Sequence, residues 1–171
     1  ISNGGMVKKM YFPREILSLS QVTYTFIVFL IAYTIVIALM AIVGAPLSSE
    51  GLLALPVIIV AMFFFSLGTI MFTSSISVYS RDFEYFITAT ARVLFWVTPI
   101  FYMTDSLTGI LNTIVWINPL TYYVEGLHDI IYRGIMPSTE LLAIAVIISA
   151  VTFIAGAAVF QKLKDGFAER L

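Results

Sequence analysis

The chain has 171 residues and a mass of 19.0 kDa, but 60% of its residues are hydrophobic and only 11% are charged. A water-soluble domain usually has about 25% charged residues, because its surface must be wetted, so that class is excluded. The net charge of −1, with no basic run longer than Lys8-Lys9, gives no electrostatic basis for binding nucleic acid. The absence of cysteine excludes disulfides, thiolate metal sites and a cysteine nucleophile.

Long charge-free stretches follow one another along the chain. No charged residue lies between Glu15 and Glu50, between Glu50 and Arg81, or between Glu140 and Lys162. A bilayer core of about 30 Å needs roughly 20 apolar residues of helix. We therefore predict an all-α polytopic membrane protein, a single transmembrane domain over 1–171, with four spans at 21–43, 52–79, 83–103 and 141–161.

Residues 106–124 are also uncharged and raise the alternative of a fifth span. Gly109, Asn112, Asn118 and Pro119 interrupt any long helix there. With four spans both ends are cytoplasmic, including the tail at 162–171, and one basic residue, Arg133, faces outward. The positive-inside rule favours this topology, which places the following basic residues in the cytoplasm: Lys8, Lys9, Arg14, Arg81, Lys162, Lys164 and Arg170.

The outer segment 107–134 is too apolar for an ordinary loop. We expect a helix over 107–117, a break at Asn118-Pro119 with proline at a helix start, and a second helix over 120–133 that Gly134 closes. Non-helical backbone at membrane depth is tolerated only against protein or water. The segment is therefore predicted to be a re-entrant or interfacial helical hairpin.

The second helix of this hairpin carries polar residues on one face: Tyr122, Glu125, His128, Asp129 and Arg133. Glu125 and His128 form an ExxH pair that resembles half of a di-metal carboxylate motif, but that chemistry needs a second copy and further ligands. A solvated polar face is the favoured interpretation. The sequence contains no phosphate-binding glycine loop, HExxH or GxSxG motif, and we expect no metal and no cofactor on this chain.

Arg92 is the main candidate for a substrate contact. It lies about 13 Å into the third predicted span, where a charge costs on the order of 3 kcal/mol unless it faces a cavity or a partner. Snorkelling and pairing with Glu84 are the structural alternatives. Thr88, Phe95, Trp96, Pro99 and Tyr102 recur with it at helical spacing, so we predict a substrate conduit lined by Thr88, Arg92, Phe95, Trp96 and Tyr102. Each aromatic residue alone is better explained by packing on neighbours or by the interfacial belt.

The second span has a stripe of small hydroxylated residues, Ser66, Thr69, Thr73 and Ser77. Such residues allow close helix approach in membranes, and a polar conduit lining is the alternative. Ahead of the first span, 7–16 mixes basic, aromatic and acidic residues. It is either an interfacial anchor or a docking element for a soluble partner built from Lys9, Tyr11, Phe12, Pro13, Arg14 and Glu15.

Four segments in order resemble the permease subunits of ABC-type exporters of polysaccharide and teichoic acid precursors. They are KKMYFPREI, RDFEYFITATARVLFWVTPIFY, NPLTYYVEGLHDIIYRG and FQKLKDGFAERL, and the resemblance covers nearly the whole chain. The family has six spans and an N-terminal interface helix. Because the chain opens on Ile1 and has four predicted spans, we expect that the helix and the first two spans are missing.

The resemblance implies a homodimeric permease with two separate cytoplasmic ATPase subunits that hold ATP and Mg. It implies that 7–16 is the coupling helix and that 107–134 forms the outer gate, for which Tyr122, Glu125 and Asp129 are the candidate residues. The expected function is export of a lipid-linked polysaccharide or teichoic acid precursor across the cytoplasmic membrane of a bacterium, without enzymatic activity on this chain. The alternatives are a drug- or lipid-exporting ABC permease, a non-transporting membrane scaffold, or a membrane-embedded lipid-modifying enzyme.

Overall fold

The computed structural model describes residues 15–45, 47, 49–78 and 80–163, and every regular element in these ranges is helical. The long helices are α2 (Glu15–Val43), α3 (Ser49–Ser77), α4 (Arg81–Val97) and α7 (Thr139–Leu163). The short ones are the 3-10 turn η1 (Thr104–Ser106), α5 (Ile110–Ile117), α6 (Pro119–His128) and the π-helical turn η2 (Asp129–Arg133). The predicted all-α polytopic membrane fold is confirmed.

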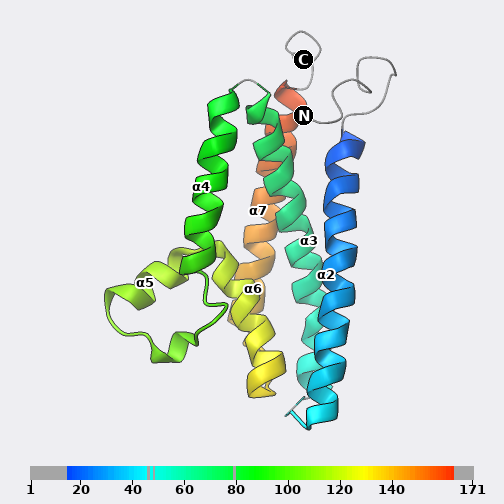
Figure 1. Ribbon diagram of the computed structural model, residues 1–171, viewed down its shortest axis with the longest axis vertical. Helices are drawn as coiled ribbons and strands as arrows, with labels where there is room; N and C mark the ends of the chain where they lie inside the picture. The colour runs from blue at the N-terminus through cyan, green and yellow to red at the C-terminus, as the bar shows by residue number, and fades with distance from the viewer. Residues whose placement is uncertain (1–14, 46, 48, 79, 164–171) are drawn as a thin grey trace.

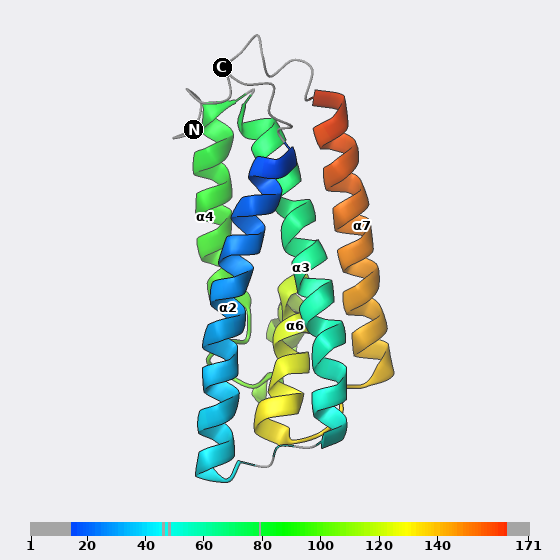
Figure 2. The same cartoon turned by 90° about the vertical axis from the view of Figure 1, so that its right-hand side faces the viewer.

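The long helices run alongside one another (Figures 1 and 2). The start of α2, the α3–α4 connection and the end of α7 lie at one end of the bundle, and the α2–α3 connection and η2 lie at the other. Three segments are long and apolar enough to cross a membrane: Leu19–Val43, Ser49–Ser77 and Thr139–Leu163. They correspond to the predicted spans 21–43, 52–79 and 141–161; how many times the chain crosses the membrane stays a prediction.

The helix predicted over 83–103 ends sooner, at Val97. Thr98 has extended backbone, φ −71° and ψ 131°, because the residue before a proline is pushed out of the helical region, and Pro99 has no N–H to continue the ladder. A helix of 17 residues is about 25 Å long. The helix α4 therefore stops about halfway along the bundle, where α6 begins (Figure 1).

The core lies between α3, α6–η2 and α7 rather than at the centre of four equal helices. Its buried residues are Ala54, Ile58, Ala61, Tyr123, Ile130, Ile131 and Ala145. The most closely packed helix pair is α3–α7, whose backbones meet at Gly68 and Gly156. By contrast, α2 leaves apolar side chains exposed from Leu19 to Val43, as expected for a helix that faces lipid or another helix.

The hairpin over 107–134 follows the predicted pattern closely. Asn118 caps α6, its side chain accepts a hydrogen bond from the Leu120 N–H at 3.0 Å, and Pro119 occupies the first turn. Gly134 ends η2 in the left-handed conformation, with φ +64° and ψ 31°, which glycine adopts without steric cost. The first hairpin helix is shorter than predicted, because it begins at Ile110 instead of 107.

Candidate functional site

The first candidate region is the exposed face of α4. Thr88, Arg92, Phe95 and Trp96 are all exposed, Trp96 to 75%. Arg92 makes no ion pair with any residue that the structure describes, Glu84 included. The Thr88 hydroxyl donates to the Glu84 carbonyl of its own helix at 2.9 Å. A cation and two aromatic rings are thus open to whatever lies beside this helix.

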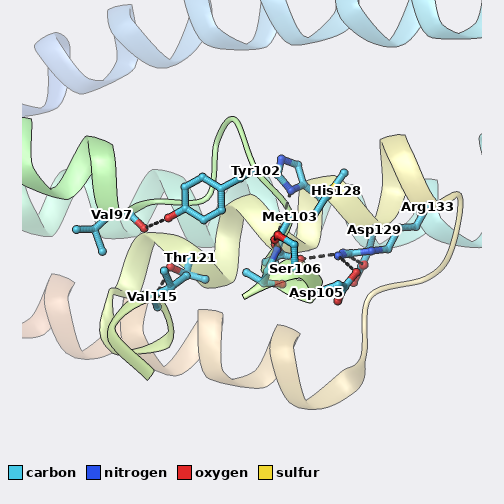
Figure 3. Close-up of polar contacts among 12 residues, drawn as sticks. Val97, Tyr102, Met103, Asp105, Ser106, Val115, Thr121, His128, Asp129 and Arg133 are labelled. Carbon is cyan, nitrogen blue, oxygen red and sulfur yellow. Dashed lines mark hydrogen bonds and ion pairs between the residues drawn. The ribbon is translucent and has the colours of Figure 1, made fainter. Parts of the chain in front are cut away.

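Pro99 and Tyr102 do not lie on the helix face that their spacing predicts beside Arg92, whereas the role of this face as a conduit stays a prediction. Pro99 is fully buried, and Tyr102 lies beyond the end of α4. The Tyr102 hydroxyl turns back and donates to the Val97 carbonyl at 2.6 Å (Figure 3). The premature end of α4 explains the change. Phe101 contacts the Phe95 ring instead, with ring centres 5.9 Å apart.

A buried hydrogen bond joins the end of α4 to the start of α6. The Asn118 side-chain N–H donates to the Thr98 hydroxyl oxygen at 2.8 Å, while the Thr98 hydroxyl donates to the Leu94 carbonyl at 2.6 Å. Thr98 and Asn118 are both buried. The one Asn118 side chain therefore caps α6 and fixes it to α4. The sequence indicated the break at Asn118-Pro119, but nothing local indicated that Thr98 is the partner of Asn118.

The second candidate region is a charged cluster at the far end of α6. One nitrogen of the Arg133 guanidinium donates to Glu125 Oε2 at 2.8 Å and to Asp129 Oδ1 at 2.7 Å. The other donates to Asp105 Oδ2 at 2.7 Å (Figure 3). The Thr104 backbone N–H donates to Glu125 Oε1 at 3.4 Å. The η1 turn thus lies against the polar face of α6–η2.

The prediction that this polar face is solvated is wrong. Glu125 is 3% exposed, and His128 is also buried. The η1 turn covers Glu125, and Arg133 supplies the positive charge that a buried carboxylate requires. Tyr122 does not join this cluster: its hydroxyl donates to the Trp116 carbonyl at 3.2 Å, and it packs on the Trp116 ring. Among the described residues, no group of His, Asp and Glu is arranged to hold a metal ion.

The electrostatics of the cluster follow from its geometry. Burial by itself raises the pKa of Glu125, but hydrogen bonds and the Arg133 charge outweigh it and lower this pKa to about 2. We assign the lowering to Arg133 and Thr104, because His128 Nδ1 lies 3.7 Å from Glu125 Oε1, too far for a hydrogen bond. Burial raises the pKa of Asp129 despite its bond to Arg133. Arg133 in turn has a raised pKa, chiefly through its bond to Glu125.

The predicted coupling residues Lys9, Tyr11, Phe12, Pro13 and Arg14 lie outside the described residues, as does most of the tail at 162–171. Glu15 is the first residue of α2, and its side chain is likewise outside the described part. Their role stays a prediction. Sequence reasoning missed Asp105 and Thr104 entirely, because their contacts with Arg133 and Glu125 cross more than 20 positions of chain.

The fold and these two regions define a polytopic helical membrane protein in which α4 ends early and a hairpin of short helices follows it. The model of the ABC-2 type transporter family matches residues 2–132, and the chain belongs to this family. The resemblance inferred from the sequence is thereby confirmed.

Two relatives, both named O-antigen export system permease protein RfbA and both from Klebsiella pneumoniae, align over all 171 residues. They are 30% and 27% identical to the chain. The chain spans 66% of the length of each relative.

Proposed function

We propose that the chain is the permease subunit of an ATP-driven exporter that moves a lipid-linked surface polysaccharide or teichoic acid precursor across the cytoplasmic membrane of a bacterium. The family match and the names of the two relatives support a polysaccharide exporter. The single structural observation that carries the proposal is Arg92, an exposed cation beside the exposed rings of Phe95 and Trp96 on one face of α4.

This face suits an amphiphilic phosphoglycan. Arg92 supplies a positive charge for a phosphate, and guanidinium binds phosphate oxygens strongly. Phe95 and Trp96 offer ring faces and edges to the apolar surfaces of sugars or to the lipid chain. Because nothing described covers this face, a second copy of the chain would complete the conduit, and α4 of each copy would form one wall.

Energy comes from a separate cytoplasmic ATPase subunit, which holds ATP and Mg. The segment 7–16 is its contact, through Lys9, Tyr11, Phe12, Pro13, Arg14 and Glu15. The hairpin 107–134 serves as the outer gate. Within that hairpin, Asn118 ties the start of α6 to the end of α4, so a movement of α4 reaches the gate directly.

The decisive experiment is reconstitution of the full-length permease with its ATPase in proteoliposomes. We expect ATP-dependent movement of a lipid-linked glycan, and failure to move it while the ATPase still co-purifies would overturn the substrate class. Arg92→Ala should reduce export and substrate-stimulated ATP hydrolysis at least about tenfold, as expected for loss of a charge-assisted contact. The matched control is Lys162→Ala, which removes one exposed positive charge from α7.

The coupling role is tested separately. Replacing Phe12 and Arg14 with alanine should abolish co-purification of the ATPase while the permease stays folded. Retained co-purification would contradict the assignment of 7–16. A lipid-modifying enzyme would need Glu125, His128 and Asp129 free for chemistry, whereas Arg133 neutralises both carboxylates. Export that survives replacement of all three residues would argue against the enzyme.

A further inference from the structure

The charged cluster at the end of α6 has strong bonds within one element and weak bonds between elements. Glu125, Asp129 and Arg133 belong to the continuous run α6–η2, and their bonds are 2.7–2.8 Å long. They hold the guanidinium in place without help from the rest of the chain. The side chain of Arg133 is therefore oriented before anything docks on it, which lowers the entropy cost of a further contact.

Two weaker contacts join this cluster to the η1 turn: the exposed Asp105–Arg133 ion pair and the long Thr104–Glu125 hydrogen bond. The Asp105 side chain is 75% exposed, so water and salt weaken its bond to Arg133. The Thr104 N–H bond to Glu125 Oε1, at 3.4 Å, is longer than the usual range for such a bond. When both links open, Arg133 still keeps Glu125 and Asp129 as partners.

His128 is a second possible donor to Glu125 Oε1, the oxygen that the Thr104 N–H binds in the structure. His128 Nδ1 is 3.7 Å from the same Glu125 Oε1, and it is buried with no hydrogen-bond partner among the described residues. A buried polar atom without a partner is costly. A small shift of the imidazole would therefore satisfy both Nδ1 and the Glu125 oxygen once the turn has left.

From this geometry we propose that the η1 turn, Thr104–Ser106, is a releasable strap. In the docked position Asp105 binds Arg133, and the Thr104 N–H binds Glu125. In the released position His128 takes over Glu125 Oε1, and the strap moves away from α6–η2. Two alternative partners for one oxygen make the strap a two-position element, the requirement for a switch.

The hydrogen bond between Asn118 and Thr98 limits how much of the chain is released with the η1 turn. Thr98 and Asn118 stay bonded in a buried site, and the Tyr102 hydroxyl stays bonded to the Val97 carbonyl, so the end of α4 remains fixed to α6 while the chain beyond Tyr102 moves. The strap concerns the hairpin proposed above as the outer gate, and to that extent it rests on the proposed function. Its own test measures backbone exchange, so the two ideas can fail separately.

The experiment is amide hydrogen exchange of the full-length protein in lipid nanodiscs, followed at the peptide that contains Thr104 and Leu107. Asp105→Asn removes the exposed charge without disturbing the buried part of the cluster. We expect exchange of the Thr104 amide to rise about two- to fivefold, the range for loss of an exposed ion pair. Glu140→Gln is the matched control, an exposed carboxylate at the start of α7. Equal exchange in the two variants would overturn the strap.

The histidine has its own arm in the same experiment. His128→Phe keeps an aromatic ring against Tyr132, now 5.3 Å away, but removes the second donor. Exchange of the Thr104 amide should be slower in His128→Phe than in the wild type, and slower in the double variant than in Asp105→Asn alone. The reason is that the released state then lacks the bond from His128 to Glu125. A rate unchanged by His128→Phe would overturn the exchange of partners. Amides of α7 near Ser149 serve as the internal reference for an intact fold.

Discussion

Gly68 of α3 and Gly156 of α7 touch backbone to backbone. A Cβ placed on Gly156 would overlap the Gly68 carbonyl oxygen, and one placed on Gly68 would lie 2.5 Å from the Thr152 carbonyl oxygen. Only glycine permits this approach, which is the usual way helices associate in membranes, where apolar burial gives no net gain. The closely packed α3–α7 pair therefore supports α6, which packs against both helices.

Gly156→Ala should destabilise the protein by about 1–3 kcal/mol, the cost of overpacking a tight contact. The measurement is thermal unfolding of the purified protein in detergent. Ala158→Val is the control, because it adds methyl groups at an exposed position of the same helix and should have little effect. Equal unfolding temperatures for the two variants would show that the helices can separate without loss.

Asn118→Ala should lower the free energy of unfolding more than Asn118→Ser does. Alanine loses both the cap on α6, about 1 kcal/mol, and the buried bond to Thr98, about another 1 kcal/mol. Serine can still cap the helix but is too short to reach Thr98, so it loses one contribution. The free energy of unfolding in denaturant checks the order. If serine is as harmful as alanine, the cap contributes nothing.

Tyr123→Phe should lower the free energy of unfolding by about 0.5–1.5 kcal/mol. The buried Tyr123 hydroxyl lies 2.7 Å from the Ser149 hydroxyl oxygen and donates to the Ala145 carbonyl at 3.2 Å. Ser149 itself keeps a bond to the Ala145 carbonyl, which limits the loss. Tyr85→Phe, at an exposed position of α4, is the control and should leave unfolding unchanged. An effect of the same size in both variants would refute the role of this bond.

Acid should weaken the protein through Glu125. Its pKa in the folded protein is about 2, below the ordinary value of 4.5, so its ionised form stabilises the fold above about pH 4.5. That contribution is lost as the pH falls from about 4.5 towards 2. Thermal unfolding at about pH 6 and pH 3 measures the loss, and Glu125→Gln should reduce it.

Asp129 provides the contrast for this acid effect. Its pKa is raised by burial, so protonation of Asp129 favours the folded state as the pH falls and opposes the effect of Glu125. Asp129→Asn should therefore leave the acid loss as large as in the wild type, or make it larger. An acid loss that disappears in Asp129→Asn and persists in Glu125→Gln would reverse the assignment.

The sequence predicted what is local and periodic. Charge-free runs located the long helices, and Asn118-Pro119 and Gly134 located the hairpin breaks, because each of these residues acts on its own backbone. The end of α4 was missed although Pro99 signals it; the uncharged run continues past Pro99 and hides the break.

Contacts between residues that are far apart in the sequence could not be predicted. The hydroxyl stripe on α3 predicts close helix approach or a polar conduit lining, and the structure shows Thr69 and Thr73 bonded to carbonyls of their own helix. The close approach of α3 to α7 is made at Gly68, which was not singled out from the sequence. Glu125 looked solvated because Asp105 and Thr104, which cover it, are far away in the sequence. Single positions do not reveal such partners.

The end of α4 beside the start of α6 has an electrostatic consequence. A helix carries about half a negative charge at its carboxyl end and half a positive charge at its amino end. The hydrogen bond from Asn118 to Thr98 brings the carboxyl end of α4 next to the amino end of α6. The two partial charges lie side by side and offset each other, so the chain can interrupt a helix deep inside the bundle without leaving an uncompensated helix dipole there.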